Sequence, residues 1–140
     1  LFVEFRHASW IRDDVFSFLE GEGLGYVSVD EPDLPGLVPP IARATGSIGY
    51  ARFHGRNKAN WWGSGPAGAG GASGDRYDYL YSEAELKEWV DKIRDLSQKT
   101  VKTFVFFNNC HVGQAAAGAK LMRRLLDLPE PALADLPGLL

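Results

Sequence analysis

Hydrophobic residues in this chain gather in four short runs of the kind that form β-strands. They cover residues 1–5, 24–29, 48–54 and 102–107. The second run stops at Asp30 and Pro32, and a proline-marked loop then continues to about Thr45. Short apolar runs bounded by turn residues are typical of buried strands. We therefore predict four strands over these ranges.

Three other stretches carry apolar residues at helical spacing, over residues 13–21, 82–96 and 113–128. The second begins with Ser82-Glu83-Ala84-Glu85, a capping box. Its predicted inward face comprises Leu86, Trp89, Val90, Ile93 and Leu96. The outer face offers two favourable i, i+4 ion pairs, Glu83 with Lys87 and Glu88 with Lys92. The third helix would bury Ala115, Ala119, Met122, Leu125 and Leu126 and end before Pro129.

The alternation of these strands and helices predicts an α/β fold with a parallel sheet and right-handed crossovers. A TIM-type barrel needs about eight strands and about 250 residues, so four strands have the dimensions of half of one. An open parallel sheet is the alternative. We expect residues 1–140 to form one such partial domain, in which residues 63–76, rich in glycine, alanine and serine, form a flexible loop.

Polar side chains with catalytic potential follow three of the predicted strands. In the first and third strands, alternation places Glu4, Arg6, Arg52 and His54 on one face and apolar residues on the other. Buried charges without a partner are costly. We therefore expect these four side chains to pair at the carboxyl ends of the strands, where β/α barrels hold their sites.

Composition narrows the class of protein. A net charge of −3 argues against binding nucleic acid or anionic membrane by bulk attraction, although a local basic cleft remains compatible with it. The single cysteine, Cys110, suits a reducing compartment, and we expect a cytoplasmic protein. No apolar run reaches the roughly 18 to 20 residues that span a bilayer, so we expect no membrane association.

Four motifs in order carry a resemblance to a known family. They are Val-Glu-Phe-Arg-His-x-Ser-Trp at 3–10, Arg-Phe-His-Gly-Arg-Asn at 52–57, Tyr-Asp-Tyr-Leu-Tyr-Ser at 77–82 with Glu-Leu-Lys-Glu-Trp at 85–89, and Phe-Phe-Asn-Asn at 106–109 with Gly-Gln-Ala at 113–115. Together they resemble the YecE-like family, domain of unknown function 72. The resemblance implies a TIM (β/α)8-type barrel of which this chain is the carboxyl-terminal half, strands five to eight.

The same resemblance implies a partner, the missing amino-terminal half of the barrel, but no established activity. The family's barrel is similar to those of the endonuclease-IV and xylose-isomerase group, which makes phosphodiester or sugar chemistry an analogy. Two features depart from the family pattern. Cys110 stands where family members often have histidine, and the tract from 63 to 74 looks like an insertion.

One constellation suits a phosphate-bearing ligand. Guanidinium groups match phosphate oxygens and flat aromatic rings stack on bases or sugars. The candidates are Arg52, His54, Arg56, Asn57 and Lys58, with Trp61, Trp62, Tyr77, Tyr79 and Tyr81. Arg6 is a further candidate binding residue. Arg56 and the amino end of the last helix are expected near the phosphate position of barrels. In the alternative, the arginines bind Glu4, Asp78 or loop carbonyls, and the aromatic rings pack a long loop.

Carboxylates, histidine and asparagines supply the candidates for chemistry. Glu4 and Asp30 end neighbouring strands, so their carboxylates are expected within about 5 to 10 Å of each other. They would then act as a catalytic pair or hold a divalent metal with His54 or His111. The alternative is a carboxylate that only pairs with arginine. His54 is the candidate general base.

Asn108 and Asn109 follow the last strand and suit either of two roles. They would donate to an oxyanion or a sugar hydroxyl, or else cap the turn into the last helix.

Two functions follow. The leading hypothesis is a hydrolase or lyase acting on a nucleotide, nucleic acid or phosphosugar, in which Arg52 and Arg56 hold the anion, His54 is the base, and Glu4 or Asp30 orients it or a metal. The alternative is a non-catalytic module that binds nucleotide or single-stranded nucleic acid with the same arginines and aromatic rings. A half barrel without activity of its own is the third possibility.

Overall fold

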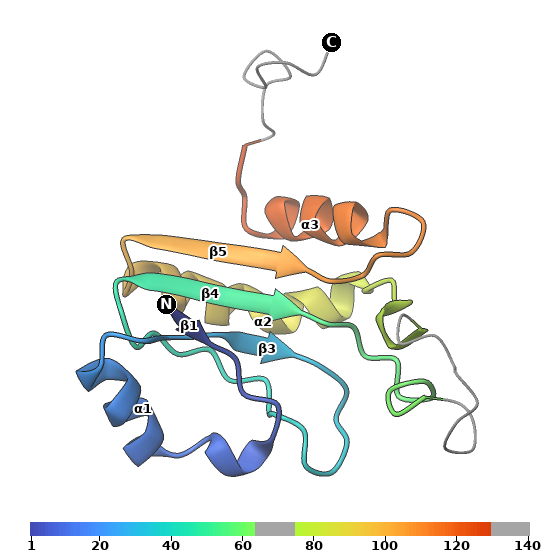
Figure 1. The fold of residues 1–140 in the computed structure, drawn as a ribbon. Coiled ribbons are helices and arrows are strands. Elements are labelled where there is room, and N and C mark those ends of the chain that lie inside the picture. The colour runs from blue at the N-terminus through green and yellow to red at the C-terminus, as the bar shows by residue number, and fades with distance from the viewer. Residues whose placement is uncertain (64–74, 130–140) are drawn as a thin grey trace.

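The computed structural model describes residues 1–63 and 75–129, which form an α/β structure with parallel strands and flanking helices (Figure 1). The strands are β1 Phe2–Val3, β2 Gly25–Tyr26, β3 Ser28–Asp30, β4 Ile48–Phe53 and β5 Lys102–Phe107. The helices are α1 Asp13–Gly21, α2 Glu83–Gln98 and α3 Gln114–Leu125, with short 3₁₀ turns η1 Ala8–Trp10 and η2 Asp75–Tyr77.

The strands lie side by side in chain order. β1 pairs with β2, and β3, β4 and β5 form a three-stranded sheet, all in parallel. The single strand predicted at 24–29 is divided into β2, which pairs with β1, and β3, which pairs with β4. The division falls at Val27, whose N–H still donates to the Val3 carbonyl. The predicted strand at 1–5 is shortened to β1, because its neighbour β2 is only two residues long.

α2 confirms the helix predicted from local pattern. Ser82 caps it in a reciprocal capping box with Glu85, and the five predicted inward residues are all buried. Glu83 pairs with Lys87 at 2.7 Å as expected. The second predicted pair is wrong, because Glu88 binds Arg56 and the Lys92 ammonium binds the Pro40 carbonyl.

α3 is shorter than predicted, beginning at Gln114 after Gly113, which has a φ of 75°. Met122 is buried, whereas the other predicted inward residues are only partly buried. The closest contact with the sheet was not predicted: a Cβ on Gly118 would lie 2.8 Å from the Phe107 ring. This glycine therefore lets α3 approach β5.

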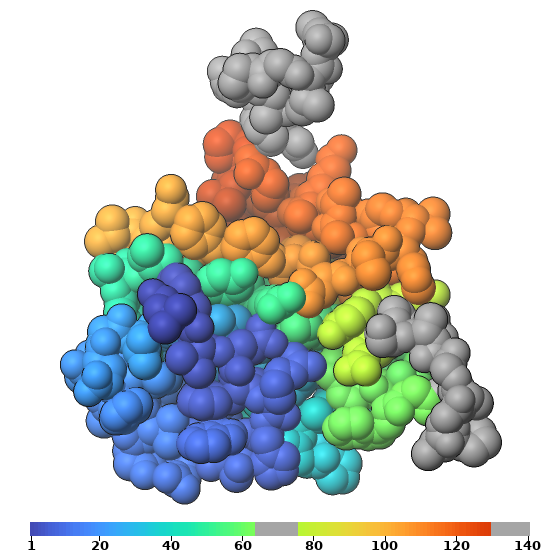
Figure 2. Space-filling model, viewed as in Figure 1, coloured from blue at the N-terminus to red at the C-terminus, as the bar shows by residue number. Residues whose placement is uncertain are grey.

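The two faces of the sheet differ. One face packs against α2, where Ala51 and Phe53 join Trp89 in the main core (Figure 1). The other, the open face, carries stacked rings of Tyr50 and Phe106, 5.1 Å apart, and Phe106 is 45% exposed. Figure 2 shows atoms of β4 and β5 at the surface beside the N-terminal segment.

The described strands do not form a closed barrel, since they make one two-stranded sheet and one three-stranded sheet. Most of the loop predicted at 63–76 lies outside the described residues, and its last two residues fall in η2. The structure thus establishes a parallel α/β arrangement whose strand ends carry the polar residues considered next.

Candidate functional site

Two polar clusters lie at the carboxyl ends of the strands, on opposite faces of the sheet. Parallel neighbours in register share a face, and Val29 is paired with Arg52 whereas Asp30 is paired with Phe53. Arg52 therefore belongs to the open face and Asp30 to the face that packs on α2. We call the first group the Glu4 cluster, comprising Glu4, Arg6, Glu31, Arg52, His54 and Asn108. The second, the Asp30 cluster, comprises Asp30, Arg56, Tyr81, Glu88 and Trp89.

Glu4 is the hub of its cluster. Its Oε1 accepts a hydrogen bond from Arg6 Nη1 at 2.8 Å and lies 2.9 Å from His54 Nε2, while its Oε2 accepts from Arg52 Nη1 at 3.0 Å. Burial alone would raise the pKa of Glu4, but His54, Arg6 and Arg52 outweigh it and lower the pKa to about 2. The expected pairing of these four side chains is present, and Glu4 is an anion at neutral pH.

The hydrogen bonds around His54 assign its tautomer. Arg52 Nε donates to Asn108 Oδ1 at 3.1 Å, so the Asn108 amide nitrogen faces His54 Nδ1 at 3.0 Å and donates to it. Nδ1 is then an acceptor, and in a neutral imidazole the proton lies on Nε2 and points to Glu4. The Nε2–H and the Arg6 Nη1 donor, 2.9 Å apart, therefore both face Glu4 Oε1. His54 is only 2% exposed. Both ring nitrogens are thus occupied, and a general-base role requires one of these bonds to break.

The arginines are the most exposed charged groups of this cluster. The side chains of Arg6 and Arg52 are 44% and 38% exposed, whereas those of Glu4 and Glu31 are 16% and 0% exposed. Within residues 1–63 and 75–129, no hydrogen bond involves Nε or Nη2 of Arg6 or Nη2 of Arg52. Solvent-facing N–H donors are therefore left over on both guanidinium groups.

Glu31 is the member that sequence reasoning missed. Its side chain is fully buried and its Oε1 accepts the Val38 N–H at 2.7 Å. Its Oε2 has no hydrogen-bond partner within the described part of the chain and lies 3.8 Å from Arg6 Nη1. Burial raises the pKa of Glu31. Alternation was the available signal, because Glu31 follows Asp30 and points to the other side of the sheet.

Asp30 and Arg56 are held by bonds within the fold. Asp30 accepts from Arg56 Nε and Nη2 at 2.9 and 2.6 Å, from the Tyr81 hydroxyl at 2.6 Å and from Trp89 Nε1 at 2.6 Å. Arg56 also binds Glu88 at 2.8 Å. The expected partnership of Asp30 with Glu4, and of Arg56 with Arg52, is not formed, because the side chains leave the sheet on opposite faces. Asp30 instead links β3 to α2.

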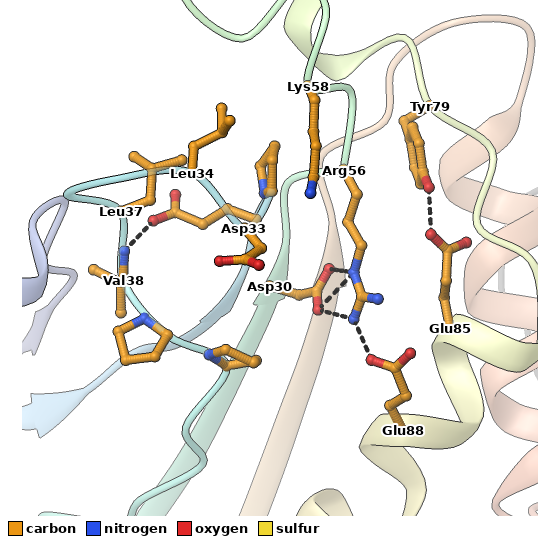
Figure 3. Close-up of a pocket in the computed structure, with 14 residues that line it drawn as sticks. Asp30, Asp33, Leu34, Leu37, Val38, Arg56, Lys58, Tyr79, Glu85 and Glu88 are labelled. Atoms are coloured by element: carbon orange, nitrogen blue, oxygen red, sulfur yellow. Dashed lines mark hydrogen bonds and ion pairs between the residues drawn. The ribbon is translucent and has the colours of Figure 1, made fainter.

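A pocket of about 600 Å³ opens above the Asp30–Arg56 pair (Figure 3). Arg56 lies between Asp30 and Glu88, and Lys58 extends toward the pocket. Five acidic residues line it against two basic ones. Arg56 is neutralised by its partners, so the pocket has an acidic excess that disfavours a phosphate group. This pocket and the Glu4 cluster are thus different places.

The remaining candidate binding residues make contacts within the fold. Asn57 donates to the Asp78 carbonyl at 3.1 Å, and Asn109, which is buried, donates to the Tyr77 carbonyl at 3.2 Å. The Tyr79 hydroxyl donates to Glu85, whose negative charge and the burial of the ring raise the pKa of Tyr79 to about 12. These bonds tie loops together, as in the structural alternative.

Most of the aromatic residues expected to stack on a base are also engaged. Trp61 and Tyr81 are buried, whereas Trp62 is 71% exposed. The expected anion position at the start of α3 is weakened too, because Gln114 N–H donates to the His111 carbonyl and Ala115 N–H to that of Asn109. Two of its first amides are therefore satisfied by the chain itself.

A metal centre finds no support in the described residues, where no three or more histidine, cysteine, aspartate or glutamate side chains come together in a suitable group. His111 instead pairs with Asp78 at 3.3 Å. In the same residues, none of the helices has the length and apolar character needed to cross a membrane.

The fold and the site define the class of protein: it is an α/β protein with parallel strands and polar clusters at their carboxyl ends. Residues 1–138 match the family described as "Protein of unknown function DUF72". The chain belongs to this family, the same one that its motifs resemble.

Relatives of known sequence and structure agree. The chain is 38% identical over 138 residues to the UPF0759 protein YunF of Bacillus subtilis (strain 168), covering 94% of this chain and 48% of the relative. A DUF72 family protein of Thermotoga maritima MSB8 is 45% identical with a TM-score of 0.80, over 91% of this chain and 46% of that one. A DUF72 family protein of Enterococcus faecalis V583 is 30% identical with a TM-score of 0.81, and the match covers 99% of this chain and 50% of that one. The chain therefore spans about half the length of these relatives.

Proposed function

We propose that the Glu4 cluster binds the phosphate group of a small ligand and that the protein is a hydrolase or lyase acting on it. The observation that carries this proposal is the convergence of Arg6 and Arg52 on one carboxylate, Glu4. The guanidinium donors that the cluster leaves unused on both arginines face solvent and match phosphate oxygens. The cluster lies at the carboxyl ends of parallel strands, the usual place for sites in such folds.

The chemical step requires His54 to be released. Substrate binding at Arg52 would draw this guanidinium from Asn108, and the Asn108 amide would then be free to rotate away from Nδ1 of His54. Nδ1 would accept a proton from water or from the substrate, while Glu4 stabilises the resulting imidazolium through Nε2. This is the role expected of a general base held by a carboxylate.

A second candidate, a non-catalytic nucleotide or nucleic-acid binding module, is favoured by one observation. Both nitrogens of His54 are engaged in hydrogen bonds, so the arrangement as it stands binds an anion without a free base. Trp62, 71% exposed, would supply a stacking surface. Turnover separates the two candidates, since only the enzyme converts its ligand.

Calorimetric titration with inorganic phosphate, nucleoside monophosphates and sugar phosphates tests the shared step. Arg52→Gln should weaken binding by about 10- to 100-fold, the effect of one lost charge-assisted hydrogen bond. Arg43→Gln is the matched control, because this arginine pairs with Asp13 on α1 and should leave binding unchanged. Equal binding by wild type and Arg52→Gln, or none by a folded wild type, would refute the anion site.

Release of product from any ligand that binds then tests catalysis. His54→Gln should abolish turnover while ligand binding persists, because the solvent-facing donors of Arg6 and Arg52 remain in place. Circular dichroism would establish that the variant is folded. Binding without turnover by the wild type would favour the non-catalytic module.

We further propose that the open face is the interior of a TIM-type barrel and that a complementary set of strands packs against it. Exposed stacked rings such as Phe106 support this, because apolar surface of this kind is usually covered. The relatives' greater length supplies room for such strands. The lone Cys110 supports a cytoplasmic location.

A further inference from the structure

Arg6 lies between the carboxylates of Glu4 and Glu31, which differ in the number of hydrogen-bond donors around them. Its Nη1 is 2.8 Å from Glu4 Oε1 and 3.8 Å from Glu31 Oε2. Glu4 already receives Arg52 and His54, whereas Glu31 Oε2 is buried and has no hydrogen-bond partner among the residues described. A buried carboxylate oxygen without a donor is costly, and the nearest cation is Arg6.

The position of Arg6 against Glu4 is crowded. Its Nη1 lies 2.9 Å from His54 Nε2, and the tautomer assigned above places a proton on both nitrogens. Two N–H donors in contact repel each other while they share one acceptor, Glu4 Oε1. A shift of Arg6 toward Glu31 would relieve this repulsion and satisfy the unpartnered oxygen.

We propose that Glu31 sets the anion affinity of the Glu4 cluster by competing with the ligand for Arg6. Charged Glu31 draws the guanidinium inward, and uncharged Glu31 leaves it to the anion. This inference rests on the proposed function, because it assumes that Arg6 and Arg52 form the anion site. Glu31 acts through Arg6 and is buried, so it is a positioning residue that determines affinity.

Other ionisable groups face Glu31 from the neighbouring elements. Glu4 and Arg6 follow β1, Tyr26 belongs to β2, and His54 follows β4. The pKa of Glu4 is lowered to about 2 and that of Tyr26 is raised by burial, so neither changes charge between pH 5 and 8. Glu31, whose pKa is raised by burial, is the carboxyl group to follow in a pH experiment.

Sulfate is the suitable probe, because it keeps its charge across this pH range, whereas phosphate titrates. Calorimetry at pH 7.5 should find that Glu31→Gln binds sulfate about tenfold more tightly than the wild type. Asp33→Asn is the matched control, because it removes a nearby exposed carboxylate that makes no contact with Arg6, and it should change affinity by less than about twofold. Glutamine keeps an oxygen for the Val38 N–H, so the loop should fold.

Two further measurements address the mechanism. In an Arg6→Gln background, Glu31→Gln should no longer tighten binding, since a double-mutant cycle reports coupling between the two residues. Wild-type affinity for sulfate should also rise as pH falls through the raised pKa of Glu31, and this rise should disappear in Glu31→Gln. A rise that persists in Glu31→Gln comes from another group and overturns the inference.

The outcomes distinguish this inference from the proposed function. Sulfate binding by the wild type that is lost in Arg52→Gln but unchanged in Glu31→Gln leaves the anion site standing and refutes the role of Glu31. Absence of sulfate binding in every folded variant refutes both. If Glu31→Gln does not fold, the pH dependence of the wild type and the affinity of Arg6→Gln still decide, because competition predicts a flat pH profile once Arg6 is absent.

Discussion

Asn108 determines which nitrogen of His54 carries the proton. Its amide nitrogen lies 3.0 Å from Nδ1, and its oxygen is held by Arg52 Nε at 3.1 Å, so the amide cannot turn without losing that bond. The arginine on the open face therefore controls the histidine through one asparagine. The same three residues join β4 to the loop after β5.

This relationship predicts a tautomer. Nitrogen NMR of the histidine ring should find His54 protonated at Nε2 and unprotonated at Nδ1. In Asn108→Asp the carboxylate offers only acceptors, so a proton should move onto Nδ1 and its resonance should shift accordingly. Protonation at Nδ1 in the wild type would contradict the assigned orientation of Asn108.

Glu4 should make stability depend on acid pH. Its pKa is lowered from 4.5 to about 2, so its contribution is complete above pH 4.5 and is lost as pH falls toward 2. Glu4→Gln should remove on the order of 2 kcal/mol at pH 7, after allowance for partial exposure of its arginine partners, and almost nothing at pH 2. Urea unfolding at several pH values measures this. A parallel loss at every pH would mean that the charge of Glu4 is not the stabilising factor.

Asp30 should behave as a structural anchor. Asp30→Asn removes the buried charge that balances Arg56 and replaces an acceptor for Trp89 and Tyr81, so the free energy of unfolding should fall by about 3 to 5 kcal/mol. Glu88→Gln is the control, because Glu88 is 54% exposed and should cost less than about 1 kcal/mol. Chemical denaturation measures both. A fully stable Asp30→Asn variant that has lost ligand turnover would instead restore Asp30 as a catalytic candidate.

Two helical glycines should respond oppositely to alanine. In Gly118→Ala the new Cβ would lie 2.8 Å from the Phe107 ring, and overpacking should cost about 1 to 3 kcal/mol despite the gain in helix propensity. Gly21→Ala, at the exposed end of α1 with nothing within 4 Å, should be neutral or stabilise by up to about 1 kcal/mol. The melting temperatures of the two variants, each measured against the wild type, test this prediction. Equal melting temperatures would show that α3 can retreat from β5.

Elements defined by local signals could be predicted from the sequence. The capping box and apolar face of α2 appear as expected, as does β5, because near neighbours in the chain decide capping and periodicity. The alternation of side chains along the strands also predicted correctly that Glu4, Arg52 and His54 lie on the same face of the sheet. Such signals involve only residues a few positions apart.

Pairing across the sheet required the tertiary structure. Glu88 sits four residues before Lys92, yet it binds Arg56 because β4 brings that guanidinium against α2. Asp30 and Glu4 end neighbouring strands but point to opposite faces. Glu31 comes to face Arg6 only because the segment formed by β2 and β3 pairs with β1 at its start and with β4 at its end. Local periodicity therefore determined the helices, the strands and their polar ends, while long-range packing and burial decided which charges meet and which remain available to a ligand.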